Sequence, residues 1–181
     1  LITSLIIQVE HKSHGIKQLF SLPIPKWSVY FSKLTIVISS IILTYIYFFL
    51  AIVLFGHLLG VFYPDLGFLD FQPDYLRSIK MLGMSLVASL GIVGIQFWMS
   101  FRFKNFIIPL GIGMTMVIMG LVISRAPESI YFPYSYNVLS ISLGENAPLT
   151  LGVSSVAVYS LGCFIVTCIL GYLDIKRLNV K

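Results

Sequence analysis

Residues 34–61, LTIVISSIILTYIYFFLAIVLFGHLLGV, decide the fold because they are 28 consecutive residues without a formal charge. An α-helix rises about 1.5 Å per residue and the hydrocarbon core of a bilayer is about 30 Å thick, so about 20 apolar residues cross it. Three more uncharged apolar runs occur later in the chain, at residues 81–101, 105–124 and 149–173. Because backbone groups in lipid must pair within their own segment, each run is predicted to be a transmembrane helix. The predicted fold class is all-α, a polytopic helical membrane protein with four complete spans in a single domain, 1–181.

The distribution of charge predicts the orientation of these spans. Hydrophobic residues make up 57% of the chain and charged residues 10%, against roughly 25% charged in soluble proteins. Nine of the twelve Lys and Arg residues lie in residues 10–33, in the loop 102–104 and in the tail after residue 173. Cations in short loops mark the cytoplasmic side of a membrane. We therefore predict that these segments and the C-terminus face the cytoplasm, and we expect no nucleic-acid partner despite the net charge of +5.

The start of the chain is interpreted as the end of a fifth span. It begins at Leu1 without Met, and the apolar residues 1–9 stop abruptly at Glu10. A signal peptide would have a basic start and a small-residue cleavage site, and residues 1–9 have neither. We therefore expect the sequence to be a fragment that lacks the first one to two spans.

An amphipathic helix is predicted within the cytoplasmic segment 10–33. At about 100° per residue, its apolar side chains share one stripe and its polar side chains the opposite face. That polar face carries Glu10, His14 and Lys17. Pro23 is expected to end the helix, because a prolyl ring clashes with the preceding turn. The helix either joins two spans along the membrane surface or presents its polar face to a cytoplasmic partner.

The segment 125–148 connects the last two spans on the opposite side and differs from an ordinary polar loop. It contains three prolines and a cluster of aromatic side chains, and its second half is apolar but too short to span. We predict a short interfacial or re-entrant element. Its aromatic residues are interpreted either as an anchor or as a lid that contacts substrate. Tyr134 in this segment and Gln96, one of the few polar side chains in a span, are the candidate residues of a substrate path.

Small residues and proline suggest how the spans pack. The pairs Gly56 with Gly60 and Ser85 with Ser89 are spaced four apart, as residues that allow close approach of helices often are. Pro109, with glycines two and four residues after it, is expected to break or kink its span.

Signatures of chemistry are missing from the sequence. The four spans contain no Asp, Glu, Lys or Arg, whereas ion-coupled carriers usually need an ionisable group in the membrane. No phosphate-binding loop is present, and His11 and His14 are three residues apart instead of the four that a zinc helix requires. We therefore expect neither an enzyme nor a metal or cofactor on this chain, and the energy for any transport would come from outside these helices.

Two motifs resemble a known family. One part of the chain resembles the cytoplasmic segment of type-2 ABC exporter permeases, especially those of lantibiotic and bacitracin immunity. The resemblance rests on Glu10, the stretch LFSLPIPK at residues 19–26, Tyr30 and Lys33. The stretch YFPYSY at residues 131–136 is similar to a Pro-Trp-Ser-Tyr-Pro element that these permeases carry before their last span. Here Tyr134 replaces the Trp, and Asn137 replaces the final Pro.

The resemblance implies a six-span permease of the bacterial plasma membrane that works with a second permease chain. A separate cytoplasmic subunit would bind ATP and Mg²⁺ and push on a coupling helix that maps to residues 10–20. The implied mechanism is alternating access, and the implied cargo is a hydrophobic or amphipathic molecule such as a peptide antibiotic or a drug. The alternative is a membrane module that senses or assembles and does not transport.

Overall fold

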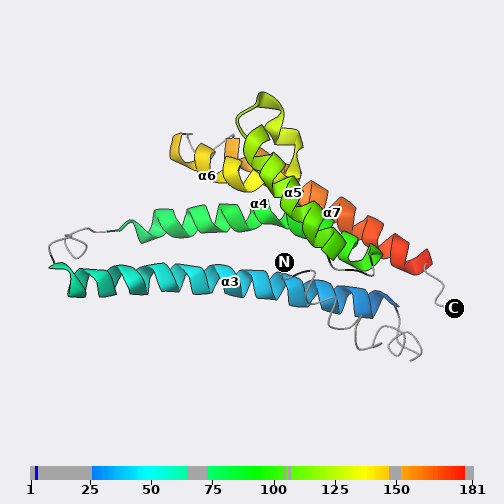
Figure 1. The fold of residues 1–181 in the computed structure, drawn as a ribbon, viewed down its shortest axis with the longest axis horizontal. Coiled ribbons are helices and arrows are strands. Elements are labelled where there is room, and N and C mark those ends of the chain that lie inside the picture. The colour runs from blue at the N-terminus through cyan, green and yellow to red at the C-terminus, as the bar shows by residue number, and fades with distance from the viewer. Residues whose placement is uncertain are drawn as a thin grey trace.

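The computed structural model describes residue 3 and residues 26–64, 73–103, 105, 107–146 and 152–177. The regular structure of the described residues is helical throughout (Figure 1). In chain order the elements are α3 (Lys26–Phe62), α4 (Tyr75–Arg102), α5 (Ile107–Ile123), the 3₁₀ turns η2 (Pro127–Tyr131) and η3 (Pro133–Ser135), α6 (Tyr136–Asn146) and α7 (Gly152–Arg177). The predicted helix at residues 10–20 lies outside the described residues.

Three helices are long and apolar enough to cross a membrane, within Trp27–Phe62, Tyr75–Arg102 and Ser155–Lys176. The apolar helix α5 is shorter, with 17 residues, which corresponds to about 25 Å of helix. The protein is therefore a polytopic helical membrane protein, as the sequence predicted.

Local sequence explains where the helices begin. α3 starts at Lys26, directly after Pro25, so residues 26–33 of the predicted cytoplasmic segment already belong to the helix. α4 starts after Asp74, whose carboxylate accepts a hydrogen bond from the backbone N–H of Arg77 at 3.0 Å. Such a cap satisfies one of the N–H groups that have no partner inside the helix.

The predicted break at Pro109 is wrong, because α5 is one continuous helix from Ile107 to Ile123. Pro109 is its third residue and is buried. The first four residues of an α-helix have no intrahelical acceptor for their N–H groups, so a proline in this turn removes no hydrogen bond.

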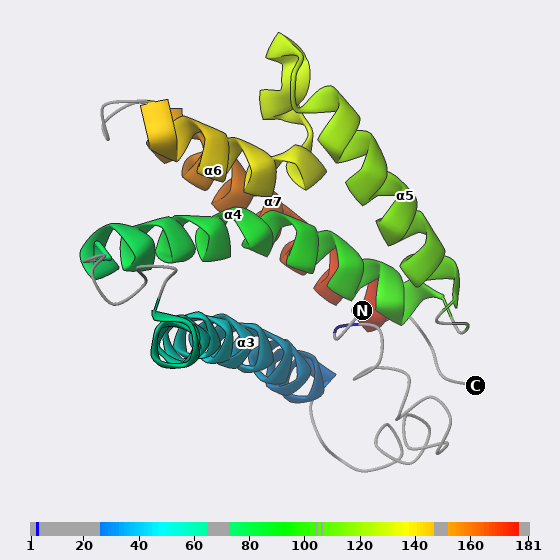
Figure 2. The ribbon, with the colours of Figure 1, turned by 60° about the vertical axis from the view of Figure 1, so that its left-hand side comes forward.

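α4 is the central helix of the fold, and α7 packs along it (Figure 2). Glycines bring the two helices together. A Cβ added at Gly91 would lie 3.2 Å from the Oγ of Ser160, and one added at Gly94 would collide with the Oγ1 of Thr167. One core cluster joins α4 and α7 to α3, and a smaller one joins them to α6 through Ala88, Tyr136 and Val156.

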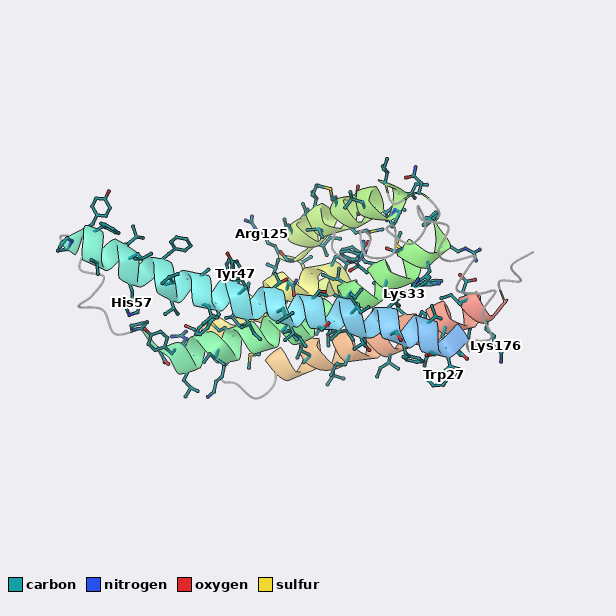
Figure 3. The ribbon with its side chains drawn as sticks, turned by 90° about the horizontal axis from the view of Figure 1, so that it is seen from below. Trp27, Lys33, Tyr47, His57, Arg125 and Lys176 are labelled. Carbon is teal, nitrogen blue, oxygen red and sulfur yellow. The ribbon has the colours of Figure 1, made fainter. Side chains whose placement is uncertain are left out.

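Much of α3 faces away from the other helices. Its buried hydrophobic residues all lie in its first turns and are Tyr30, Leu34 and Val37. Many side chains farther along are exposed, and that of Tyr47 is 74% exposed. Figure 3 shows Trp27, Lys33 and Lys176 at one end of the molecule and His57 at the other. We call the first of these ends the basic end. An apolar exposed surface of this kind is suited to lipid.

Candidate functional site

The predicted coupling residues Glu10, His14 and Lys17 lie outside the described residues, but the helix to which their segment leads is described. That helix, α3, starts at Lys26, and one face of its first turns packs against α4 and α7. The contacts of these turns therefore determine how the predicted cytoplasmic segment is connected to the membrane helices.

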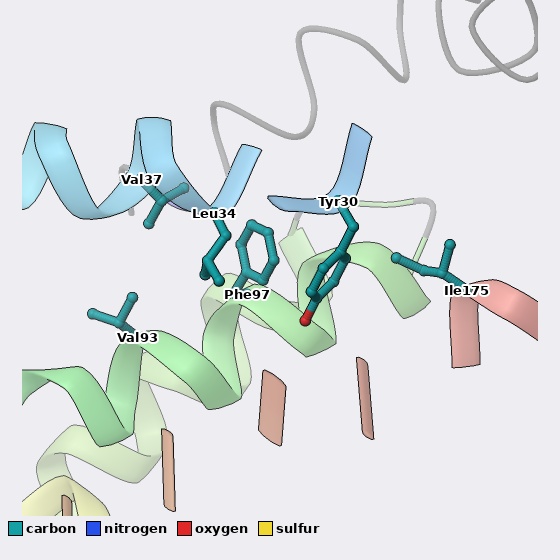
Figure 4. Packing of buried hydrophobic residues seen from close by; sticks show 6 residues of the cluster. All are labelled: Tyr30, Leu34, Val37, Val93, Phe97 and Ile175. Atoms are coloured by element: carbon teal, nitrogen blue, oxygen red, sulfur yellow. The ribbon is translucent and has the colours of Figure 1, made fainter. Parts of the chain in front are cut away.

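Tyr30 is the centre of this connection and is only 1% exposed (Figure 4). Its hydroxyl donates a hydrogen bond to the backbone carbonyl of Cys168 on α7 at 2.9 Å. Its ring lies 5.2 Å from that of Phe97 and 5.7 Å from that of Phe101, both on α4, and 6.0 Å from that of Tyr172 on α7. Aromatic pairs at such separations are favourable beyond the area they bury. We call Tyr30, Phe97, Phe101 and Tyr172 the Tyr30 cluster.

Two further residues fit the Tyr30 cluster closely. A Cβ added at Gly171 would lie 2.7 Å from the hydroxyl oxygen of Tyr30, so the tyrosine occupies space that only glycine leaves open. The Nζ of Lys33 lies 5.3 Å from the centre of the Phe101 ring, and Lys33 is only 4% exposed. A cation within about 6 Å of a ring face is attracted by the ring quadrupole.

An ion pair joins α4 to α7 at the same end of the molecule. A guanidinium nitrogen of Arg102 lies 2.7 Å from a carboxylate oxygen of Asp174. The Arg102 side chain is 60% exposed, so solvent weakens the pair and its contribution to stability is small. The pair shows that the loop after α4 and the last turns of α7 lie on the same side of the bundle.

Gln96 and Tyr134, the candidate residues of a substrate path, are in direct contact. The side-chain amide of Gln96 donates a hydrogen bond to the hydroxyl of Tyr134 at 3.0 Å. Burial raises the pKa of the Tyr134 phenol above its ordinary value, so the hydroxyl stays protonated at neutral pH. Gln96 lies six residues before Arg102, which is about 9 Å along the helix. The backbone of Tyr134 lies against Gly120, three residues before the end of α5, so it is the Tyr134 side chain that reaches Gln96.

Two glycines of α5 make room for this contact. A Cβ added at Gly113 would collide with the side-chain amide of Gln96, and one added at Gly120 would lie 2.6 Å from the backbone oxygen of Tyr134. Backbone atoms cannot move aside as a flexible side chain can. Gly120 therefore sets the distance between α5 and the turn η3.

The four residues predicted to pack helices differ in their surroundings. A Cβ at Gly56 would meet nothing within 4 Å, whereas Gly60 is buried. Ser85 contacts α3 through a hydrogen bond of 3.2 Å between its hydroxyl and that of Tyr45. Ser89 is 8% exposed and donates to the carbonyl of Leu86 in its own helix.

Sequence reasoning missed the side chains of α7 that do meet other helices. Five residues of α7 contact α3 or α4 and follow one another at spacings of four and three. They are Ser160, Phe164, Thr167, Gly171 and Ile175. Spacings of three and four place side chains on one helix face. That pattern, with Gly91 and Gly94 three apart on α4, was present in the sequence and would have identified the packing face of each helix.

Metal chemistry finds no support in the described part of the chain. No group of three or more His, Cys, Asp or Glu side chains that could hold a metal ion occurs there. Its two cysteines, Cys163 and Cys168, are free thiols that pack between the helices.

Comparisons with known proteins agree with this architecture. The comparisons with curated proteins and with solved structures gave no match. A family model described as ABC-2 family transporter protein matches residues 1–120, which is about two thirds of the chain. The matched region contains the cytoplasmic segment, α3, α4 and most of α5, so it covers the predicted coupling residues as well as Gln96. The chain therefore belongs to the ABC-2 family of transporter proteins, as a membrane subunit of the permease type.

Proposed function

We propose that this chain is the permease of an ATP-driven exporter of the bacterial plasma membrane, with its C-terminus in the cytoplasm. A separate subunit binds ATP and Mg²⁺, and a second permease chain completes the transport unit. This chain itself holds no cofactor. The proposed cargo is a hydrophobic or amphipathic molecule such as a peptide antibiotic or a drug. The family match over residues 1–120 carries the proposal, because it includes the segment on which an ATP-binding subunit would act.

The Tyr30 cluster supports a mechanical role for that segment. Residues 10–25 lead directly into α3, and the first turns of α3 are held against both α4 and α7. A displacement of Lys26 toward or away from the membrane therefore moves a buried tyrosine that touches two other helices. Packed interiors transmit such shifts because they leave few voids. In the proposed mechanism, ATP binding favours one arrangement of the bundle, which requires that the nucleotide-bound subunit bind the two arrangements with different affinities.

The contact between Gln96 and Tyr134 supports a polar element on the proposed transport path. It lies between α4, α5 and the turn η3. An amphipathic cargo that passes between these helices would exchange hydrogen bonds with this pair. The cargo would then have an apolar body and at least one hydrogen-bonding group.

The proposal is tested with the full-length protein and its ATP-binding subunit, purified together and placed in liposomes. The double variant Glu10→Gln and Lys17→Gln should lose the ATP-binding subunit during purification, because two charges of the docking face are gone. Arg125→Gln is the matched control, since it removes a charge from the segment 125–148 on the opposite side. We expect the control to keep its partner and its ATP hydrolysis. If both preparations contain the same amount of ATP-binding subunit, docking at Glu10 and Lys17 is wrong.

The second step separates docking from coupling. Gly171→Ala should retain the ATP-binding subunit but lower the protection of cells against bacitracin or a lantibiotic, because the added methyl group displaces Tyr30. Gly162→Ala, on the same helix, adds a methyl group where nothing lies within 4 Å and should behave as the wild type. A full-length preparation that binds no ATP-binding subunit at all would favour the sensing or assembly alternative.

A further inference from the structure

A cleft lies between α3 and α4 at the end of the molecule opposite to the basic end. Its volume is about 410 Å³. One wall is a single face of α3 that runs from Phe49 to His57, and the other is formed by Pro73 and the first turns of α4 as far as Leu82. Figure 3 shows His57 near this end, far from Trp27 and Lys176.

The cleft is closed toward the basic end and open at Gly56. The hydroxyl groups of Tyr45 and Ser85 are 3.2 Å apart and connect α3 to α4 one turn before the cleft begins. Beyond this contact the helices diverge around the cavity. A Cβ added at Gly56, which lines the cavity, would meet nothing within 4 Å among the described residues.

The lining changes from apolar to polar along the cleft. Phe49, Ile52, Val53 and Met81 offer only apolar side chains, whereas His57 and Tyr75 lie toward the rim. The Nδ1 of His57 is 2.8 Å from the carbonyl oxygen of Val53, to which it donates a hydrogen bond. The Tyr75 side chain is exposed. A molecule with an apolar tail and a polar head matches this order.

The shape of the cleft suits a lipid chain. Phe49 to His57 corresponds to about 12 Å of helix, and the cavity of about 410 Å³ runs along this length. A hydrocarbon chain, whose carbon atoms contact their neighbours at about 4 Å, has room to lie along both walls.

We propose that this cleft binds one acyl chain of a phospholipid from the adjacent leaflet, with the headgroup near His57 and Tyr75. Both walls belong to helices that can span a membrane, so the cleft opens onto lipid. Water is a poor occupant because apolar cavities stay dry. An empty cleft would leave its lining without van der Waals partners on one side, and a chain supplies them. The bound lipid completes the packing of two helices that the protein itself leaves apart.

Photochemical labelling tests the proposal. The full-length protein with its ATP-binding subunit is placed in liposomes of phosphatidylethanolamine and phosphatidylglycerol with a trace of phosphatidylcholine that carries a diazirine near the end of one acyl chain. After irradiation, the labelled residues are identified by peptide mass spectrometry. We expect the label to concentrate in residues 49–57 and 73–82, above the level found on other exposed faces of α3 and α7.

Gly56→Phe places a ring in the cleft, because Gly56 lines the cleft and the space around its Cβ is open. Gly83→Phe is the matched control, since Gly83 is also open to a Cβ but lies outside the cleft lining. Labelling at residues 49–57 and 73–82 should be lost in Gly56→Phe and retained in Gly83→Phe. Even labelling of all exposed faces, or labelling unchanged in Gly56→Phe, overturns the proposal. Because no transport is measured, either result is independent of the proposed exporter function.

Discussion

The hydroxyl of Ser160 on α7 accepts a hydrogen bond from the backbone N–H of Gly91 on α4 at 2.9 Å. The same hydroxyl donates to the carbonyl oxygen of Val87 at 2.8 Å. Val87 and Gly91 are four residues apart in α4, so the carbonyl of Val87 and the N–H of Gly91 are the acceptor and donor of one backbone hydrogen bond of that helix. The fully buried Ser160 hydroxyl of one helix thus bonds both backbone groups of a helical hydrogen bond in another. A side chain at such a hydrogen bond is a recognised cause of local bending in long helices.

Ser160→Ala is expected to destabilise the bundle by about 1 kcal/mol, because hydrogen bonds between membrane helices contribute about 0.6 kcal/mol on average and up to about 1.7. The free energy of unfolding in mixed detergent micelles measures the effect. Thr115→Ala is the control, since the Thr115 hydroxyl is exposed and bonds only the Gly111 carbonyl of its own helix. Equal stability of the two variants would show that the bridge between α4 and α7 contributes nothing.

Gly120→Ala should destabilise the protein by about 1 to 3 kcal/mol, the usual cost of overpacking. The added methyl carbon would lie 2.6 Å from the backbone oxygen of Tyr134, so either α5 or the turn η3 must shift. Gly111→Ala on the same helix meets nothing within 4 Å and should be neutral or stabilising by up to about 1 kcal/mol, because alanine favours helix. Thermal unfolding in detergent compares the two, and a lower midpoint for Gly111→Ala would contradict the packing of α5.

The helical membrane architecture could be predicted from the sequence because its cause is local. A run such as residues 34–61 must form a helix in lipid whatever its neighbours do. The ends of the helices were less predictable, since charged residues such as Lys26 and Arg102 extend the uncharged runs and are still helical. The effect of Pro109 was also misjudged, because a proline kinks a helix only beyond its first turn.

Contacts between helices were the part that local reasoning could not supply. Gln96 and Tyr134 were singled out for separate reasons, and nothing in their spacing of 38 residues indicates that they touch. The small-residue rule identified Gly56, which borders an open cleft, and missed Gly91, which meets Ser160. A four-residue spacing shows that two side chains share a face, whereas the partner of that face depends on the whole bundle.

Gln96→Leu and Tyr134→Phe should be non-additive in stability. Each variant alone removes one partner of the 3.0 Å hydrogen bond and leaves behind either the buried Tyr134 hydroxyl or the half-buried Gln96 amide without it, at an expected cost of about 1 kcal/mol. The double variant loses the bond only once, so a double-mutant cycle should give a coupling of about 0.5 to 1.5 kcal/mol. A coupling near zero would show that the two side chains do not interact in the membrane.

Gly171→Ala and Tyr30→Phe are expected to compensate one another. Alone, Gly171→Ala places a methyl carbon 2.7 Å from the Tyr30 hydroxyl oxygen, which must move away from its bond to Cys168. Removing the hydroxyl leaves the ring carbon Cζ at 3.5 Å and the Cδ1 of Trp98 at 3.4 Å as the nearest atoms, both at ordinary contact distance.

Each single variant should lower the free energy of unfolding by about 1 to 2 kcal/mol, through a clash in one case and the loss of the hydrogen bond to the Cys168 carbonyl in the other. The double variant should be less destabilised than the sum, because the clash no longer exists and only the lost hydrogen bond remains. Unfolding in detergent measures all four proteins of this cycle. Strict additivity would mean that Tyr30 does not occupy the space at Gly171, and the connection of α3 to α7 through the Tyr30 cluster would then be wrong.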